Sequence, residues 1–189
     1  MDMAGTWTEA EFESIFREEF ARMVRVVRRV LSSDAEAEEI CAEAFLKLYR
    51  MGPDEIAEGT AGAWLYRVTT RSAIDRLRRQ KRRGVEEQLG AGSTDIAGDL
   101  ESDPLCRMVR EERIAEVRLA LGRLKVEKAQ VLLLRHSGLS YQEIAAAMRI
   151  KPASVGTMLA RAEAEFSTLY RRQQRLSKRV PRLQAAKEG

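Results

Sequence analysis

The chain has 189 residues, of which 44% are hydrophobic, and a formal net charge of +4 with an isoelectric point near 9.3. This length allows one domain or two small ones, and the lack of any apolar run of about eighteen residues argues against a transmembrane helix. The first residues, MDMAGTWTEAEFESIF, lack the basic and apolar segments of a secretory signal, so we expect a cytoplasmic protein. Cys41 and Cys106 fit no metal-binding spacing and are expected to be thiols of a cytosolic protein rather than a disulfide.

Three helices are predicted in the first part of the chain, and strand-like alternation is absent throughout. Apolar residues at helical spacing indicate a helix over about 9–31. Asp34 can cap a second helix over about 35–50, and the glycine- and proline-containing segment 51–62 predicts a loop. A long helix is then expected over about 63–83. The fold class predicted from these patterns is all-α.

The charges are distributed in blocks. Seven basic residues and a single acid, Asp75, occupy 71–83, whereas 84–103 contain six acids and no basic residue. The residues from 171 to 187 are basic again. Such blocks suggest two modules with a polyanionic partner, although each charged run could also be a solvated surface.

The second part of the chain is also predicted to be helical. One helix is expected to end near residue 123, and the next, within VEKAQVLLLRHSG, is expected to stop at Gly138. We therefore predict two small helical domains joined by a flexible acidic linker, with a helix-turn-helix closing the second domain. The boundaries are 9–83 for the first domain, 84–109 for the linker, 110–170 for the second domain and 171–189 for a basic tail.

The stretch GLSYQEIAAAMRIKPASVGTMLARAEAEF, residues 138–166, predicts two short helices joined by a tight turn. Ser140 is a good N-cap, and Glu143 three residues later completes a capping box. Pro152 suits the first turn of the following helix. This pattern is typical of a helix-turn-helix that places its second helix in the DNA major groove, but an ordinary αα-hairpin in a helical core would show it too.

Three stretches, taken in order, resemble bacterial RNA polymerase sigma factors of the extracytoplasmic-function (ECF) group. EAEEICAEAFLKLYR (36–50) is similar to the helix that these factors dock on the clamp of core polymerase. AWLYRVTTRSAIDRLRR (63–79) is similar to the helix that contacts the minus-ten promoter element, and LLLRHSGLSYQEIAAAM (132–148) leads into the domain that reads the minus-thirty-five element. The resemblance implies a non-enzymatic factor that binds core RNA polymerase, recognises promoter DNA and helps to open it.

The resemblance also assigns residues to each surface. The expected polymerase contacts are Glu36, Glu39, Glu43, Leu46 and Lys47. The expected minus-ten contacts are Arg67, Arg71, Arg76, Arg78 and Arg79. The expected helix-turn-helix contacts to DNA are Tyr141, Gln142, Lys151, Ser154, Thr157 and Arg161. Trp64 and Tyr66 could stack on unpaired bases, although Trp64 lies on the apolar stripe and is better placed for the core.

The sequence departs from the family pattern in both DNA-binding helices. Arg71 replaces the usual asparagine of the minus-ten helix, and Gly156 and Met158 stand where basic residues commonly touch DNA. Fewer phosphate contacts are therefore expected from the recognition helix.

Partners and alternatives follow from the same patterns. The resemblance implies an anti-sigma protein as a further partner, with no cofactor and no membrane insertion. A stand-alone helix-turn-helix regulator is the main alternative, and it would bind duplex DNA without polymerase, commonly as a dimer. The sequence has no glycine-rich phosphate loop, nucleophile motif or metal-ligand cluster, which argues against an enzyme.

Overall fold

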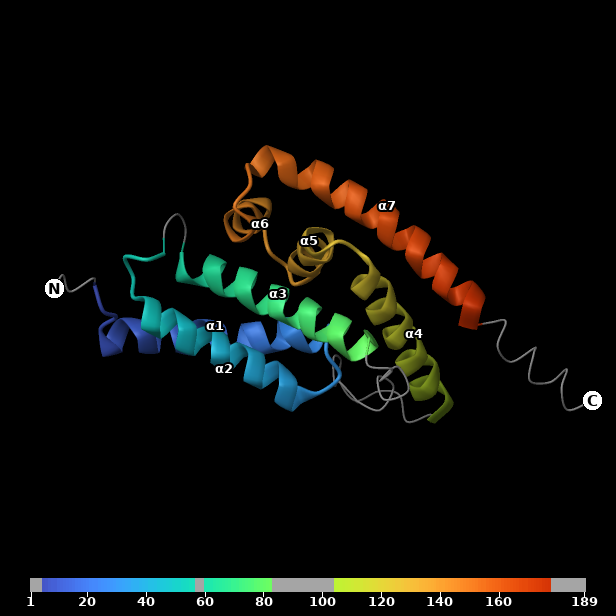
Figure 1. Ribbon diagram of the computed structural model, residues 1–189, viewed down its shortest axis with the longest axis horizontal. Coiled ribbons are helices and arrows are strands. Elements are labelled where there is room, and N and C mark those ends of the chain that lie inside the picture. The colour runs from blue at the N-terminus through green and yellow to red at the C-terminus, as the bar shows by residue number, and fades with distance from the viewer. Residues whose placement is uncertain (1–4, 57–59, 83–103, 178–189) are drawn as a thin grey trace, which may run out of the picture.

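The computed structural model describes residues 5–56, 60–82 and 104–177, and within these ranges it contains helices and connecting turns but no strand. The helices are α1 (Glu9–Arg28), α2 (Asp34–Met51), α3 (Ala61–Arg82), α4 (Pro104–Arg123), α5 (Val126–His136), α6 (Tyr141–Met148) and α7 (Pro152–Ser177) (Figure 1). The all-α prediction is confirmed. The acidic run 84–103 and residues 178–189 of the basic tail lie outside the described residues.

Local signals account for the ends of the first helices. Thr8 and Glu11 form a capping box at the start of α1, because the Thr8 hydroxyl accepts from the Glu11 amide and the Glu11 carboxylate accepts from the Thr8 amide. The N-cap of α2 is Ser33 rather than the expected Asp34, which is the first residue of the helix. The Ser33 hydroxyl accepts from the amide of Glu36 at 3.3 Å. The first helix ends three residues earlier than expected, and the buried residues that follow it turn the chain into α2.

Gly52 ends α2 in a conformation that only glycine can adopt here. Its φ is +71°, and a Cβ atom at this position would lie 2.2 Å from the carbonyl oxygen of Gly5. The close approach ties the start of the chain to the end of α2, where the Trp7 indole also donates to the carbonyl of Leu48 at 2.9 Å.

The second module, α4–α7, extends further than the sequence patterns indicated. α4 begins at Pro104, inside the segment expected to be linker, because proline fits a first helical turn. α7 continues to Ser177, past the expected domain boundary at residue 170, and includes the start of the basic tail. Phe166 and Leu169 explain the extension, since both are partly buried and pack against the core at helical spacing.

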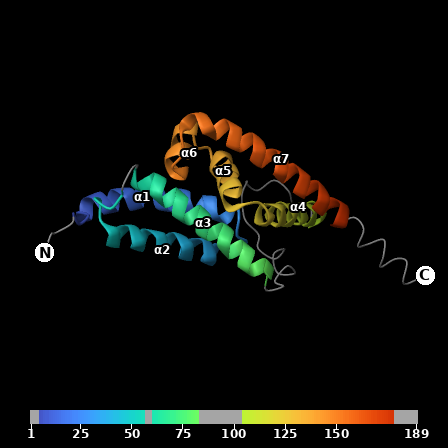
Figure 2. The same ribbon diagram turned by 45° about the horizontal axis from the view of Figure 1, so that its top comes forward.

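α3 is the central helix of the molecule. It packs against α1 and α2 of its own module and against α4, α5 and α6 of the other. Figures 1 and 2 show α3 between the α1–α2 pair on one side and α5 and α6 on the other, with α7 outermost. The helix that carries the predicted minus-ten arginines is therefore also the place where the two modules meet.

Neither cysteine takes part in a disulfide. Cys41 is buried, and this burial together with the nearby Glu38 carboxylate raises the pKa of its thiol to about 12. Cys106 is exposed on α4. In the described parts of the chain, no helix combines the length and apolar character that a bilayer-spanning segment needs.

Candidate nucleic-acid interface

The helix-turn-helix is built as its sequence indicates. The Ser140 hydroxyl accepts from the Glu143 amide at 3.3 Å, and the Glu143 carboxylate accepts from the Ser140 amide at 2.7 Å. Arg149 ends α6 in the left-handed conformation, with φ 54°, and Pro152 opens α7 three residues later. The capping box and the left-handed turn together set the angle between the two helices.

All six residues predicted to contact DNA from this motif are exposed: Tyr141, Gln142, Lys151, Ser154, Thr157 and Arg161. Ser154, Thr157 and Arg161 follow one another at spacings of three and four, so they share one face of α7. Val155 and Leu159 of the same helix are buried, as expected for its core-facing side. The guanidinium of Arg135 lies 5.5 Å from the centre of the Tyr141 ring and adds positive charge beside this surface.

Removing the cap is expected to weaken the motif. Ser140→Ala should lower the free energy of unfolding by about 1 kcal/mol, since it deprives the first turn of α6 of its side-chain acceptor. The hydrogen bonds from Ser140 lower the pKa of the Glu143 carboxyl. The stability that these bonds to the carboxylate contribute is present above the unfolded-state pKa of about 4.3, and it is lost as the pH falls through the lower folded value. Urea unfolding at neutral pH and at about pH 3 would measure both effects, and an equal loss at the two pH values would contradict the assignment.

The five predicted minus-ten arginines are not equivalent. Arg71 and Arg79 are exposed on α3, whereas Arg67, Arg76 and Arg78 are partly buried. The structure therefore presents two of these arginines to solvent and engages at least two of the others, Arg76 and Arg78, in contacts within the protein.

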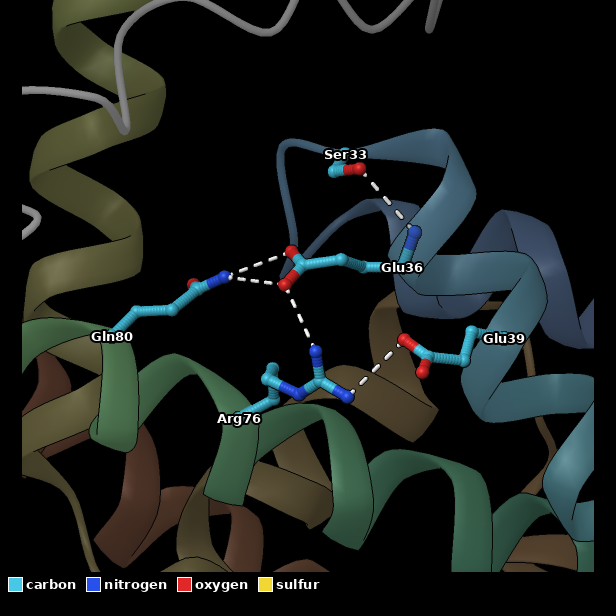
Figure 3. A network of polar contacts seen from close by, with 5 residues as sticks. All are labelled: Ser33, Glu36, Glu39, Arg76 and Gln80. Atoms are coloured by element: carbon cyan, nitrogen blue, oxygen red, sulfur yellow. Dashed lines mark hydrogen bonds and ion pairs between the residues drawn. The ribbon is translucent and has the colours of Figure 1, made fainter.

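Arg76 is held by the helix that was predicted to bind polymerase. Its guanidinium donates to Glu36 at 3.0 Å and to Glu39 at 3.3 Å, bridging α3 and α2. Gln80, one turn further along α3, donates to both oxygens of Glu36, at 3.0 and 2.8 Å (Figure 3). Arg76, assigned to DNA from the sequence, thus binds two residues assigned to polymerase, Glu36 and Glu39. Both carboxylates have an internal role in addition to any external contact.

Four of the five predicted polymerase contacts are exposed on the outer face of α2. Glu39, Glu43, Leu46 and Lys47 are all exposed on α2, and Leu46 is 49% exposed. Ile40 and Leu48 of the same helix are buried. α2 thus has the apolar inner face and mixed outer face that a helix needs to dock on another protein.

The aromatic residues of α3 do not present faces for base stacking in this arrangement. Trp64 and Tyr66 are both buried. Burial is also the main cause of the raised pKa of the Tyr66 hydroxyl. The suggestion that Tyr66 stacks on a base is therefore wrong for this arrangement, because the ring is covered by the surrounding helices. Trp64 is a core residue, as its place on the apolar stripe indicated.

Sequence reasoning missed two polar residues that are buried between the modules, Arg118 and Gln130. One signal was present for Arg118, which lies four residues after Ile114 and three before Leu121 and thus on the apolar face of its helix. Gln130 likewise interrupts an apolar stretch, because it lies between Ala129 and the run VLLL at 131–134. A polar residue within an apolar face indicates a specific buried partner, but not which one.

Comparisons with known proteins match both modules to one family. The family model for sigma-70 region 2 matches residues 15–83, and the model for sigma-70 region 4 matches residues 114–166, so the two together span about two thirds of the chain. By this measure the chain belongs to the sigma-70 family of transcription initiation factors. The curated relatives that it matches are named ECF RNA polymerase sigma factors, in agreement with the resemblance drawn from the sequence.

The curated relatives are distant. The chain is 28% identical over 158 residues to the ECF RNA polymerase sigma factor SigE of Mycolicibacterium smegmatis, covering 82% of this chain and 60% of SigE. It is also 28% identical over 138 residues to SigK of Mycobacterium tuberculosis H37Rv, covering 72% of this chain and 73% of SigK. The chain thus spans less than two thirds of the length of SigE and a little more than two thirds of the length of SigK.

A solved structure shares the fold. The sigma factor RpoE of Bartonella quintana, in complex with the anti-sigma factor NepR, superposes with a TM-score of 0.50 and 18% sequence identity. The match covers 85% of this chain and 96% of RpoE.

Proposed function

We propose that this chain is a promoter-specificity factor that binds core RNA polymerase in the cytoplasm, recognises promoter DNA and helps to open it. The observation that carries the proposal is the match of both modules, in order, to sigma-70 regions 2 and 4. The exposure of every predicted contact on the helix-turn-helix supports it.

Each module has a separate task in this proposal. The outer face of α2, with Glu39, Glu43, Leu46 and Lys47, docks on polymerase. The arginines of α3 follow the phosphate backbone of the opened strand, which offsets the few kcal/mol that unstacking each base step costs. The exposed face of α7 reads the duplex through hydroxyl and guanidinium contacts. None of these steps requires a cofactor.

An anti-sigma protein is proposed as a further partner. The solved relative from Bartonella quintana is bound to one, although its identity to this chain is low enough that the likeness concerns the fold. The outer face of α2 and the arginines of α3 would be the surfaces that such a protein covers.

Run-off transcription tests the proposed function. The purified chain and core RNA polymerase are incubated with a pool of genomic fragments, and each protein is also tested alone. We expect discrete transcripts only when both are present. A specific gel shift by the chain alone, without polymerase-dependent transcripts, would favour the stand-alone regulator instead.

The duplex-reading face can be tested within the same assay. The double variant Thr157→Ala with Arg161→Ala should lower run-off at least about tenfold, since a good side-chain contact to a base contributes about 1–3 kcal/mol. Thr168→Ala is the matched control on the same helix, because that hydroxyl is exposed and donates at 3.0 Å to the carbonyl of Ala164, beyond the motif. Equal activity of the double variant and the control would remove α7 from promoter recognition.

A further inference from the structure

The helix α7 carries a second group of exposed cations beyond the helix-turn-helix. It runs from Pro152 to Ser177, whereas the match to sigma-70 region 4 ends at residue 166. Arg171, Arg172 and Arg175 are all exposed in this last part of the helix. These three cations lie outside the matched residues, so the family membership assigns them no role.

Two of these arginines lie on the same face of α7 as the duplex-reading residues. Arg172 follows Ser154 by eighteen residues, and Arg175 follows Thr157 by eighteen. Eighteen residues make about five complete helical turns, so each arginine lies directly in line with its counterpart, about 27 Å further along the axis. The exposed face that reads the duplex through Thr157 and Arg161 therefore continues to the end of the helix and becomes basic there.

The end of α7 is held in place by the rest of the second module. Phe166 and Leu169 pack against the core, and the ring of Phe166 stacks on that of Tyr170 at 5.8 Å between centres. Arg123 of α4 donates to the side chain of Gln173 at 2.9 Å. α7 lies along α4 on the outside of the molecule (Figures 1 and 2). The arginines therefore keep a fixed position relative to the reading face, which lowers the ordering cost of binding.

The part of the face between the two groups opposes no phosphate. The Thr168 hydroxyl already donates at 3.0 Å to a backbone carbonyl one turn earlier. α7 contains two acids, and one of them, Glu165, is ion-paired with Lys128 of α5. The other, Glu163, comes two residues after Arg161 and so does not share its face. A neutral stretch thus separates the reading residues from the terminal cations.

We propose that Arg172 and Arg175 bind backbone phosphates of the duplex that flanks the element read by the recognition face. The distance of about 27 Å along α7 corresponds to about eight base pairs of duplex. α7 then lies along the DNA rather than entering the groove end-on, and a long recognition helix can contact the backbone with its C-terminal end in this way. This role rests on the proposed function for the placement of α7, but a phosphate contact is independent of base sequence and can be measured separately.

The contact would offset a deficit in the motif itself. Gly156 and Met158 stand where basic residues commonly touch DNA, so the first turns of α7 offer few cations to the phosphates. Arg172 and Arg175 provide two more on the same face. They would strengthen binding and fix the orientation of the helix without changing which bases it prefers.

The salt dependence of duplex binding tests the contact. The full chain carrying Arg172→Ala and Arg175→Ala is compared with wild type on a fluorescein-labelled duplex of mixed sequence, of about 30 base pairs, by anisotropy between about 50 and 200 mM salt. Each phosphate contact contributes about 0.9 to the slope of log affinity against log salt concentration, so the slope should become shallower by about 1.8. Both side chains are exposed and alanine favours helices, so circular dichroism should show an unchanged fold.

Two further variants decide whether the effect is specific. Arg110→Ala with Arg113→Ala removes the same charge at the same spacing from exposed positions of α4, and its slope should equal that of wild type. Arg172→Lys with Arg175→Lys keeps the charge and should retain the wild-type slope, because a phosphate contact needs a cation rather than a particular side-chain shape. An unchanged slope in the alanine variant, an equal change in the α4 control, a loss in the lysine variant or a wild-type chain that does not bind the duplex would each overturn the contact.

Run-off transcription with core polymerase separates this contact from the proposed function. The alanine variant should lose at least about fivefold more transcript than wild type when the salt concentration is raised from about 50 to about 200 mM. Transcripts from wild type with no difference in salt response would overturn the contact and leave the function standing. Absence of transcripts from wild type, together with the expected change in slope, would overturn the function and leave the phosphate contact standing.

Discussion

A chain carrying Leu46→Asp is expected to bind core RNA polymerase at least about tenfold more weakly than wild type while keeping its fold. Leu46 is 49% exposed at the centre of the outer face of α2, between the exposed charges of Glu43 and Lys47. An apolar side chain surrounded by a charged rim is the arrangement that dominates binding energy at protein interfaces. A carboxylate there would be desolvated without a partner, and a loss of 1.4 kcal/mol already corresponds to a factor of ten.

Titration of labelled chain with core polymerase, followed by fluorescence anisotropy, measures this effect. Met108→Asp is the matched control, because Met108 is 66% exposed and the substitution makes the same apolar-to-acid change on α4. We expect the control to bind as wild type does. Equal affinities for Leu46→Asp and wild type would exclude this face of α2 from the polymerase contact.

Phe45→Ala is expected to lower the free energy of unfolding by about 3–5 kcal/mol, the usual cost of removing a buried phenylalanine. Phe45 is 2% exposed, and its ring lies 5.1 Å from that of Phe16, 5.6 Å from that of Phe20 and 6.3 Å from that of Phe12. These contacts join α1 to α2. For a chain of this size, each kcal/mol corresponds to a shift of about 2–4 °C in the melting temperature, so the transition should fall by roughly 10 °C.

Thermal unfolding followed by circular dichroism provides the measurement, with two comparisons. Phe45→Leu keeps most of the volume and should cost less than about 1.5 kcal/mol. Tyr49→Ala removes an exposed ring whose centre lies 5.0 Å from that of Phe12, and it should have a smaller effect than Phe45→Ala. If Phe45→Ala had the same melting temperature as wild type, the aromatic cluster would not stabilise the first module as described.

Leu46→Asp and Phe45→Ala change adjacent residues, but the first is expected to weaken polymerase binding and the second to destabilise the fold. Phe45 and Leu46 are both apolar, but helical periodicity turns one inward and the other outward. The sequence separates them because Phe45 belongs to the stripe of Ile40 and Leu48, whereas Leu46 lies among charged residues. Of the candidate sites, the outer face of α2 and the face of α7 were therefore the most predictable.

The candidate site on α3 was less predictable from the sequence. Arg76 and Arg78 look alike in RLRRQKRR, yet Arg76 binds carboxylates on α2 and Arg78 binds backbone carbonyls at the end of α4. These acceptors lie about forty residues away along the chain, and side-chain periodicity carries no information about them. A run of like charges predicts a polyanion partner, but it cannot say which charges are already neutralised within the protein.

The sequence by itself determined the helices, the capping box of the helix-turn-helix and the membership of the sigma-70 family, because these depend on local spacing and on short motifs. Only the tertiary structure decided that α3 lies between the modules and that Arg118 and Gln130 are buried there. The physical reason is that burial of a polar group depends on finding a partner of matching geometry. Here those partners are backbone carbonyls and a hydroxyl of the other module, brought into reach only when the helices pack.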